Sequence, residues 1–199
     1  PLKQLFKVFK EEKIRKLSLA FFVYFIAFTG LTNILIFFLK ESLNWTTKAS
    51  SGTLVVVGII AIIVQGGLIG PLVKSFGEMR PTLVGSGFIL LACFLLITTP
   101  QENATVNIYS AVSFLAIGAG LITPTLRALI SKKLDGDNQG SILSNLQGLQ
   151  SLGGVLGIGM AGRVYDDFGP KAPFIAGGII LLFMIYLIAE GKNNNISYN

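Results

Sequence analysis

The chain has 199 residues, of which 52% are hydrophobic and only 13% are charged. Soluble domains carry about 25% charged residues, so this composition excludes an ordinary water-soluble globule. A net charge of +6 would suit a polyanionic partner, but the hydrophobicity excludes a soluble nucleic-acid-binding module.

Six apolar stretches are long enough to cross a lipid bilayer, which requires roughly 20 helical residues. Their length, and the lack of alternation between polar and apolar residues, favour helices over barrel strands. The sequence therefore predicts an all-α polytopic membrane protein. The predicted spans are 17–39, 52–73, 81–99, 108–130, 142–164 and 172–189.

Three parts follow from these spans. Residues 1–17 carry Leu2, Leu5, Phe6 and Phe9 at helical spacing, with lysines between them. This pattern predicts a basic amphipathic helix on the inner leaflet, and a solvated linker is the alternative. Residues 18–190 form the six-helix transmembrane domain, and the polar stretch 191–199 is expected to be a cytoplasmic tail.

Polar side chains inside the membrane are costly, so they mark candidate functional positions. In the first span, Thr29 and Asn33 lie near mid-depth, and Phe25 continues the same helix face. An amide beside hydroxyl and aromatic groups suits a largely apolar ligand that needs to be oriented. Gln65 is the candidate in the second span. For each polar residue the alternative is a hydrogen bond between helices.

The loop between the second and third spans is a candidate gate. Gly70 and Gly77 are expected to let the chain turn tightly, and Lys74 and Arg80 supply cations that would grip acids or lipid phosphates. Breakable ion pairs at this loop would close the cytoplasmic side. The alternative is a basic turn that only sets topology, and the two roles are compatible.

Further candidates lie in the fourth and fifth spans. Arg127 is about one turn inside the cytoplasmic end of the fourth span, where it either snorkels to the interface or serves as a gate or counter-charge for a substrate. Gln147 and Ser151 are one helical turn apart in the fifth span, with Gln150 beside them. These polar residues either line a substrate cavity or hydrogen-bond to a neighbouring helix.

Two glycine pairs at a spacing of four predict close helix packing. Gly66 and Gly70 form one pair in the second span, and Gly153 and Gly157 form the other in the fifth. Small residues at this spacing let two backbones approach each other.

The titratable residues exclude most catalytic chemistry. The chain has no histidine, and its single cysteine, Cys93, lies inside the third span, where packing is its expected role. All ten acidic residues fall in loops or at span ends. We therefore expect no enzymatic activity, no metal and no cofactor. If transport is driven by protons, the coupling acid is expected in another part of the protein.

Charge placement predicts the orientation. Twelve of the 16 lysines and arginines fall on one side of the six spans, and only Lys40, Lys48, Arg163 and Lys171 fall on the other. The positive-inside rule then places both termini in the cytoplasm. A cell membrane, or inner membrane, is the expected location.

The two halves of the chain resemble each other. Gly70, Phe76, Gly77 and Pro81 recur 92 residues later as Gly162, Phe168, Gly169 and Pro173, and the same offset superimposes the apolar segments around them. The chain therefore divides into repeats of about 18–99 and 110–190. Because each repeat has three spans, the second enters the membrane in the opposite sense. Inverted repeats of three spans are typical of secondary transporters.

A family resemblance follows from these residues. The loop from Gly70 to Arg80 resembles the second-half copy of the G-x-L-x-D-R-x-G-R-[RK] signature of the major facilitator superfamily, with Gly70, Leu72, Gly77 and Arg80 fitting or nearly fitting. Lys74 stands where the signature has an acid, and Arg80 lies one place beyond the usual arginine. The chain is similar to the C-terminal six-span half of drug:proton antiporters, including tetracycline efflux proteins. This resemblance implies half of a twelve-span fold.

The sequence thus predicts one half of a secondary active transporter that moves small organic solutes, hydrophobic or drug-like ones included, by alternating access. The resemblance alone implies proton-coupled efflux. The expected partners are the lipid bilayer, a six-span N-terminal half and a small-molecule substrate, with no nucleic acid. The alternative is a self-standing six-span protein that forms a homodimeric carrier or channel.

Overall fold

The computed structural model describes residues 7–100, 104–133 and 139–193, and the regular structure in these ranges is helical. A short helix, α2 (Lys7–Lys10), precedes the long α3 (Arg15–Glu41). The second predicted span is one continuous helical segment, Thr47–Phe76, made of α4 (Thr47–Ile63), η1 (Val64–Leu68) and α5 (Ile69–Phe76). The other long helices are α6 (Met79–Thr98), α7 (Ala104–Ser131), α8 (Gln139–Phe168) and α9 (Ala172–Asn193).

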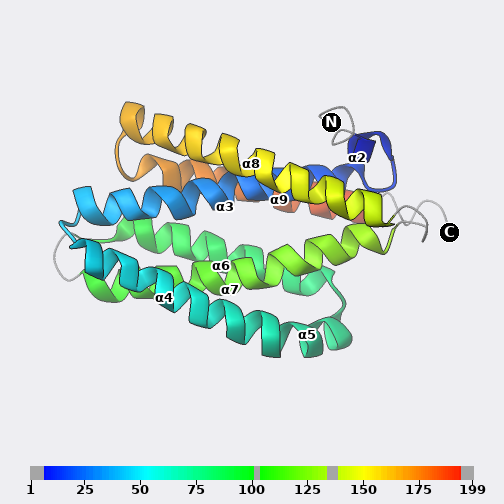
Figure 1. Ribbon diagram of the computed structural model, residues 1–199, viewed down its shortest axis with the longest axis horizontal. Coiled ribbons are helices and arrows are strands. Elements are labelled where there is room, and N and C mark those ends of the chain that lie inside the picture. Colours follow the sequence, from blue (N-terminus) through cyan, green and yellow to red (C-terminus); the bar gives the residue numbers. More distant parts are fainter. Residues whose placement is uncertain (1–6, 101–103, 134–138, 194–199) are drawn as a thin grey trace.

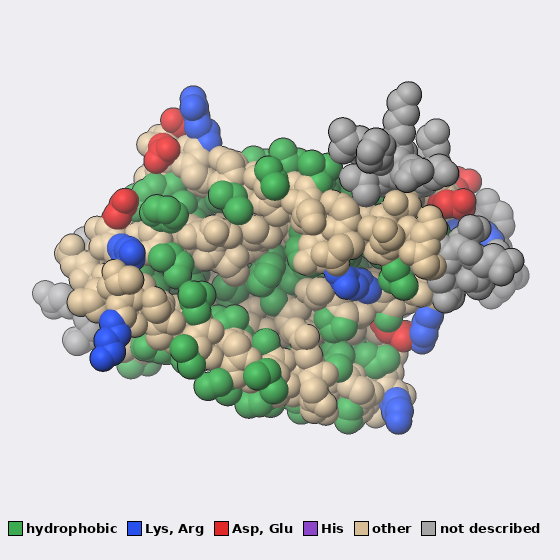
Figure 2. All heavy atoms as spheres, viewed as in Figure 1, with side chains coloured by type: hydrophobic (Ala, Val, Ile, Leu, Met, Phe, Trp, Pro, Cys, Tyr) green, Lys and Arg blue, Asp and Glu red, His purple; other side chains and the backbone are tan. Residues whose placement is uncertain are grey.

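A long helix covers each of the six predicted spans, so the prediction of an all-α polytopic protein is confirmed. Within the described ranges, five segments are long and apolar enough to cross a membrane. The remaining long helix, α8, corresponds to the fifth predicted span and has 30 residues. Its glutamines and serines make it less hydrophobic than the other five segments. Charged side chains gather mostly toward the two ends of the molecule, and hydrophobic side chains are spread over the surface between them (Figure 2).

The described part of the N-terminal segment packs against the bundle. Helix α2 contacts α3 and α8, Val8 is fully buried, and the Phe9 and Phe22 rings meet edge to face with centroids 6.5 Å apart. Leu2, Leu5 and Phe6 lie outside the described residues. Contact of this segment with the inner leaflet therefore stays a prediction.

The long helices form two groups of three that do not follow chain order (Figure 1). Helix α3 packs mainly against α8 and α9, and we call these three the first trio. Helix α7 packs mainly against α6 and α4, and these three are the second trio. The first helix of each repeat therefore packs against the last two helices of the other repeat. An inverted repeat with a two-fold axis between α3 and α7 would produce this exchange.

The 92-residue offset also holds in the backbone. It carries the segment Thr47–Phe76 onto α8 residue for residue, and it carries Gly77 onto Gly169. Both glycines have positive φ, +71° and +90°, and their N–H groups donate to the carbonyl oxygens of Val73 and Tyr165, each at 2.9 Å. Glycine is needed at these two turns because other residues rarely adopt such angles. The chain turns at Gly77, whereas Gly70 lies inside α5.

Glycine contacts bring helices together inside both trios. A Cβ atom on Gly30 of α3 would lie 2.9 Å from the carbonyl oxygen of Gly157, and one on Gly157 would clash with the carbonyl oxygen of Ile26. Gly85 of α6 and Gly118 of α7 meet in the same way. The predicted close packing at Gly153 and Gly157 is thus present. The predicted pair Gly66 and Gly70 faces open space instead, because a methyl group added at either position would have nothing within 4 Å.

The segment Thr47–Phe76 is held more loosely than α8. Only Ser50, Thr53 and Val64 are buried along it. At η1 the helix widens to the π form, which the sequence did not predict, and Val64 fits against Gly120 of α7. Short π-helical turns are rare and often occur at functional sites.

Candidate functional site

Two of the polar candidates, Gln147 and Gln150, contact Arg127, which joins three helices. Its Nη2 donates to the Oε1 atom of Gln147 at 2.9 Å and also to the Oε1 atom of Gln150. The guanidinium carbon lies 5.8 Å from the centre of the Phe21 ring, a cation–π distance. The Nε atom is buried and has no hydrogen-bond partner among the described residues. We call Arg127, Gln147 and Gln150 the arginine cluster.

Helix geometry explains how the arginine cluster forms. Gln147 and Gln150 are three residues apart and so share one face of α8. Arg127 lies one turn before the end of α7, and Phe21 belongs to α3. The sequence indicated Arg127 as a gate candidate and the glutamines as cavity candidates. The structure brings all three together.

A second polar contact lies one turn away along the same helices. The hydroxyls of Tyr24 on α3 and Thr123 on α7 are 3.2 Å apart. Thr123 precedes Arg127 by four residues and Tyr24 follows Phe21 by three, so the two contacts lie on matching faces. This contact was missed because nothing in the sequence pairs α3 with α7.

The aromatic side chains of α3 are packed rather than open. Phe25 is 4% exposed and contacts both Phe21 and Tyr24, with ring centroids 4.8 and 4.9 Å away. Tyr24 also stacks on Phe28 at 5.6 Å. Phe25 therefore packs against Tyr24 and Phe21, and its ring is not available to contact a ligand.

The remaining cavity candidates do not join the arginine cluster. Asn33 is exposed, and its Nδ2 donates to the carbonyl oxygen of Thr29 at 2.9 Å, within its own helix. Ser151 is exposed and donates to the carbonyl oxygen of Gln147 at 3.1 Å. Gln65 is exposed on η1.

The gate candidates occupy the turn between α5 and α6. Lys74 is exposed, and Arg80 lies over the Phe76 ring at 5.8 Å. The ion pair in this region belongs to Glu78, which the sequence did not single out: its Oε1 contacts Nζ of Lys132, just past the end of α7. The hydrogen bond from Lys132 lowers the pKa of the Glu78 carboxyl below its ordinary value. We call this pair the Glu78–Lys132 clasp.

A hydrogen bond beneath the clasp joins the same two helices. Thr82 of α6 and Thr125 of α7 are both buried, and their hydroxyls are 2.7 Å apart. Lys132 is 67% exposed and the Glu78 side chain only 10%. Together the two contacts fix the α5–α6 turn to the end of α7, within one trio.

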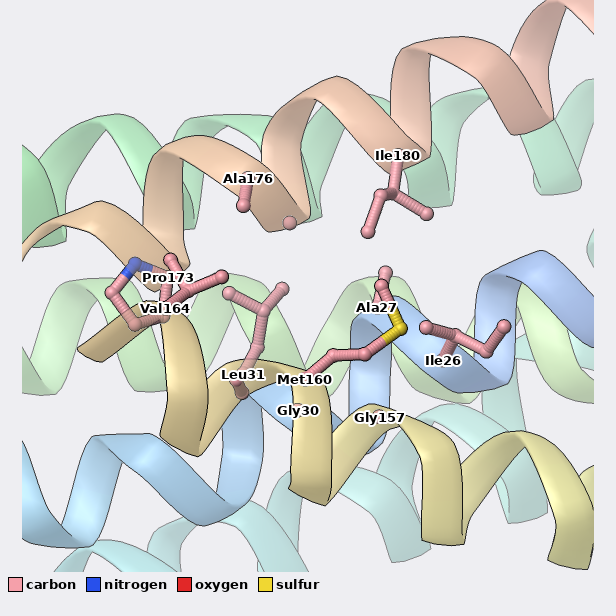
Figure 3. A pocket seen from close by; sticks show the side chains of 12 residues that line it. Ile26, Ala27, Gly30, Leu31, Gly157, Met160, Val164, Pro173, Ala176 and Ile180 are labelled. Atoms are coloured by element: carbon pink, nitrogen blue, oxygen red, sulfur yellow. The ribbon is translucent and has the colours of Figure 1, made fainter. Parts of the chain in front are cut away.

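A cavity lies between the helices of the first trio (Figure 3). Its volume is about 40 Å³, and its walls are apolar, including Leu31, Met160 and Ile180. Pockets for drug-sized ligands usually measure roughly 300–1,000 Å³. This cavity is therefore too small to hold an organic substrate. In the described part of the chain, no three His, Cys, Asp or Glu side chains gather as metal ligands would.

Comparison with known proteins identifies the family. The Major Facilitator Superfamily pattern matches residues 1–158 of the chain. The chain belongs to the Major Facilitator Superfamily. Its membrane-length helices and this membership make it an integral membrane protein of a transporter family.

Several known proteins are similar to this chain at low identity. The class C tetracycline resistance protein of Escherichia coli is 27% identical over 122 residues, covering 61% of this chain and 30% of that protein. The human hippocampus abundant transcript-like protein 1 is 22% identical, covering 95% of this chain and 41% of that protein. Mouse major facilitator superfamily domain-containing protein 10 is 23% identical, covering 90% and 39%. The chain thus spans 30–41% of the length of these curated relatives.

Proposed function

We propose that this chain is one half of a secondary active transporter that moves small organic solutes by alternating access. The observation that carries the proposal is the exchange of helices between the two repeats, because a pseudo-two-fold axis between α3 and α7 would produce it. Such symmetry allows one scaffold to favour inward- and outward-facing states in turn. Efflux is proposed from the similarity to the tetracycline resistance proteins. Coupling to protons is proposed from the resemblance of the 70–80 loop to drug:proton antiporters alone.

The proposed partner is a second six-span half. The segment Thr47–Phe76 exposes Leu54, Ile59 and Ile62, and α8 exposes Val155 and Ile158. The relatives that cover most of this chain are more than twice its length. A preceding six-helix half would lie against one or both of these segments. A homodimer of the chain is the second candidate, and it would use the same faces.

Reconstitution of the full-length protein tests transport. Tetracycline is the first solute to test, because two of the relatives are named after it. Proteoliposomes with an imposed pH gradient are expected to move it against its concentration gradient. Collapsing the gradient with an ionophore should stop the movement. Gradient-independent movement of tetracycline would contradict proton coupling, and no movement of tetracycline or of a panel of organic solutes would contradict the transport proposal.

The two partner proposals differ in what the isolated chain does. Expressed alone in a membrane, residues 1–199 are expected to need a co-expressed N-terminal half for transport. Two results together would establish the homodimer instead. One is transport by the chain alone, and the other is a disulfide cross-link between a cysteine at Ile59 of one copy and a cysteine at Ile158 of another.

Topology is tested by labelling. A cysteine replacing the exposed Lys48 should react with an impermeant maleimide added outside cells, and one replacing the exposed Lys74 should react only after permeabilisation. The reverse pattern would contradict the proposed cytoplasmic termini. Cys93 is buried and gives little background.

A further inference from the structure

The polar atoms of the arginine cluster that have no hydrogen-bond partner among the described residues are all donors. A guanidinium only donates, so both glutamines must turn their Oε1 atoms toward Arg127, as they do. This fixes the two amide orientations, because the opposite one would place NH₂ against N–H. Neither Nε2 atom has a hydrogen-bond partner in the described ranges, and Arg127 Nε also lacks one.

The charge of Arg127 is also uncompensated by the residues that the structure describes. The ion pairs there join Lys16 to Glu190, Lys132 to Glu78 and Arg163 to Asp167, and none includes Arg127. The two glutamines are neutral and the Phe21 ring offers only its electron-rich face. A buried or half-buried cation in a membrane protein is costly unless an anion pairs with it. The cluster thus lacks a negative partner.

The position of the cluster allows a ligand to supply that partner. Gln147 is exposed, and Arg127 and Gln150 are half-buried, at the end of α7 and α8 that lies near the described chain termini. Both N–H bonds of Arg127 Nη2 go to the two glutamines, so its Nη1 amino group is the donor left for a carboxylate, whose oxygens accept several hydrogen bonds. The neighbouring amide donors would complete its coordination.

We propose that Arg127, Gln147 and Gln150 bind the carboxylate of an organic-acid solute, with Arg127 as its counter-charge. This proposal rests on the proposed transport function and names its substrate class. The cation–π contact with Phe21 keeps the guanidinium in place when the site is empty, so little ordering is needed on binding.

The test uses the full-length protein in detergent with two probes of nearly equal shape, 2-naphthoate and its neutral analogue 2-naphthamide. The wild type should be stabilised against heat by naphthoate at lower concentrations than by naphthamide. Arg127→Gln should raise the naphthoate concentration needed by roughly tenfold or more, since it removes charge-assisted hydrogen bonds. The response to naphthamide should fall far less, because this neutral probe loses a hydrogen bond but no charge pairing. Arg127→Lys should fall between the two, and Arg163→Gln, at the other end of α8, serves as the matched control.

A second variant keeps the test valid if Arg127→Gln folds poorly. Gln150→Glu places a carboxylate beside the guanidinium, so the protein should be at least as heat-stable as the wild type. Its response to naphthoate should nevertheless fall, because the site then holds its own anion. An unchanged naphthoate response in Gln150→Glu, or in a folded Arg127→Gln, would overturn the proposal.

A carboxylate of the protein itself is the alternative partner, and two results would show this. Asp135 and Asp137 are the acids nearest to Arg127 in sequence and lie outside the described residues. If the double variant Asp135→Asn/Asp137→Asn binds naphthoate about tenfold more tightly than the wild type, the site is occupied by the chain itself and the proposal fails. It also fails if Arg127→Gln lowers heat stability without altering the preference between the probes, because an acid elsewhere in the protein is then the partner.

Failure of the organic-acid site can be distinguished from failure of the proposed transport function. A protein that transports neutral or cationic solutes, with no effect of Arg127→Gln on charge preference, remains a transporter but has no organic-acid site. A protein that transports no solute of any charge loses the proposed function itself.

Discussion

The segment Thr47–Phe76 and helix α8 occupy equivalent places in the two repeats, yet they are packed in opposite ways. They have equal length and end in the same glycine turn. Helix α8 meets α3 backbone to backbone at Gly157, whereas Thr47–Phe76 meets α7 through the Val64 side chain, at a π turn. Equal connectivity therefore does not imply equal rigidity, since backbone contacts cannot adapt and side-chain contacts can.

The polar residues follow the same division. Helix α8 supplies both glutamines of the arginine cluster from its tightly held part, while the equivalent segment offers only the exposed Gln65. A site that must hold a ligand with defined geometry is better built on a rigid element. The loose segment is better suited to contacts that change during a transport cycle.

The largest expected effect is at the backbone contact. Gly157→Ala should lower the free energy of unfolding by about 3 kcal/mol, because its new methyl group clashes with the Ile26 carbonyl, which cannot rotate away. Heat denaturation of the full-length protein measures the change. Gly159→Ala, with nothing within 4 Å of the added methyl, is the control and should be close to neutral. Equal stability of the two variants would remove the claimed difference in rigidity.

The two glycine turns should respond alike. Gly77→Ala and Gly169→Ala each force a side chain into a backbone region with positive φ, at an expected cost of about 2 kcal/mol. The same denaturation assay compares them. A large cost at one turn and none at the other would show that the repeat has lost its symmetry there.

The side-chain contact should be repairable, unlike the backbone one. Gly120→Ala brings its methyl group to 2.8 Å from a Val64 methyl carbon and should cost about 1 kcal/mol. Combining it with Val64→Ala should recover part of that loss, because the smaller residue makes room. A double-mutant cycle measures this coupling, and strict additivity would be the contrary result.

The smallest effect is expected at the Glu78–Lys132 clasp, which has no equivalent at the opposite turn, where position 170 is proline. Glu78→Gln should cost about 0.5 kcal/mol, since Lys132 is largely exposed. The exchange Glu78→Lys/Lys132→Glu should restore most of it, and failure to do so would show that the geometry, rather than the charge, matters.

The clasp also predicts a pH dependence. The folded-state pKa of Glu78 is lowered below 4.5, so its contribution is fully present above that value. It should be lost as the pH falls through the lowered pKa. Wild type and Glu78→Gln should therefore converge in stability below pH 4.5, and parallel curves down to acid pH would contradict the assigned ion pair.

Sequence reasoning located the long helices and the repeat because both depend on local hydrophobicity and chain spacing. It did not find the arginine cluster, since Arg127 and Gln150 lie on different helices and only their packing brings them together. It missed η1, where Val64 lies against Gly120 of α7, because no pattern in residues 64–68 distinguishes a π turn from an α-helix. The spacing of Gly66 and Gly70 predicted a close contact with another helix, but spacing alone does not show whether a helix lies beside that face.

The exchange of helices between repeats has a consequence for synthesis in the cell. Helix α3 finds its main neighbours in α8 and α9, and α8 begins about 100 residues after α3 ends. At a ribosomal rate of roughly 5–20 residues per second, α3 waits on the order of 5–20 s in the membrane without them. During that interval lipid or the insertion machinery must cover Gly30, whose partner Gly157 lies in α8, and the Tyr24 hydroxyl is without Thr123 until α7 is made. Biogenesis of this protein is therefore expected to be most vulnerable before its fifth span emerges.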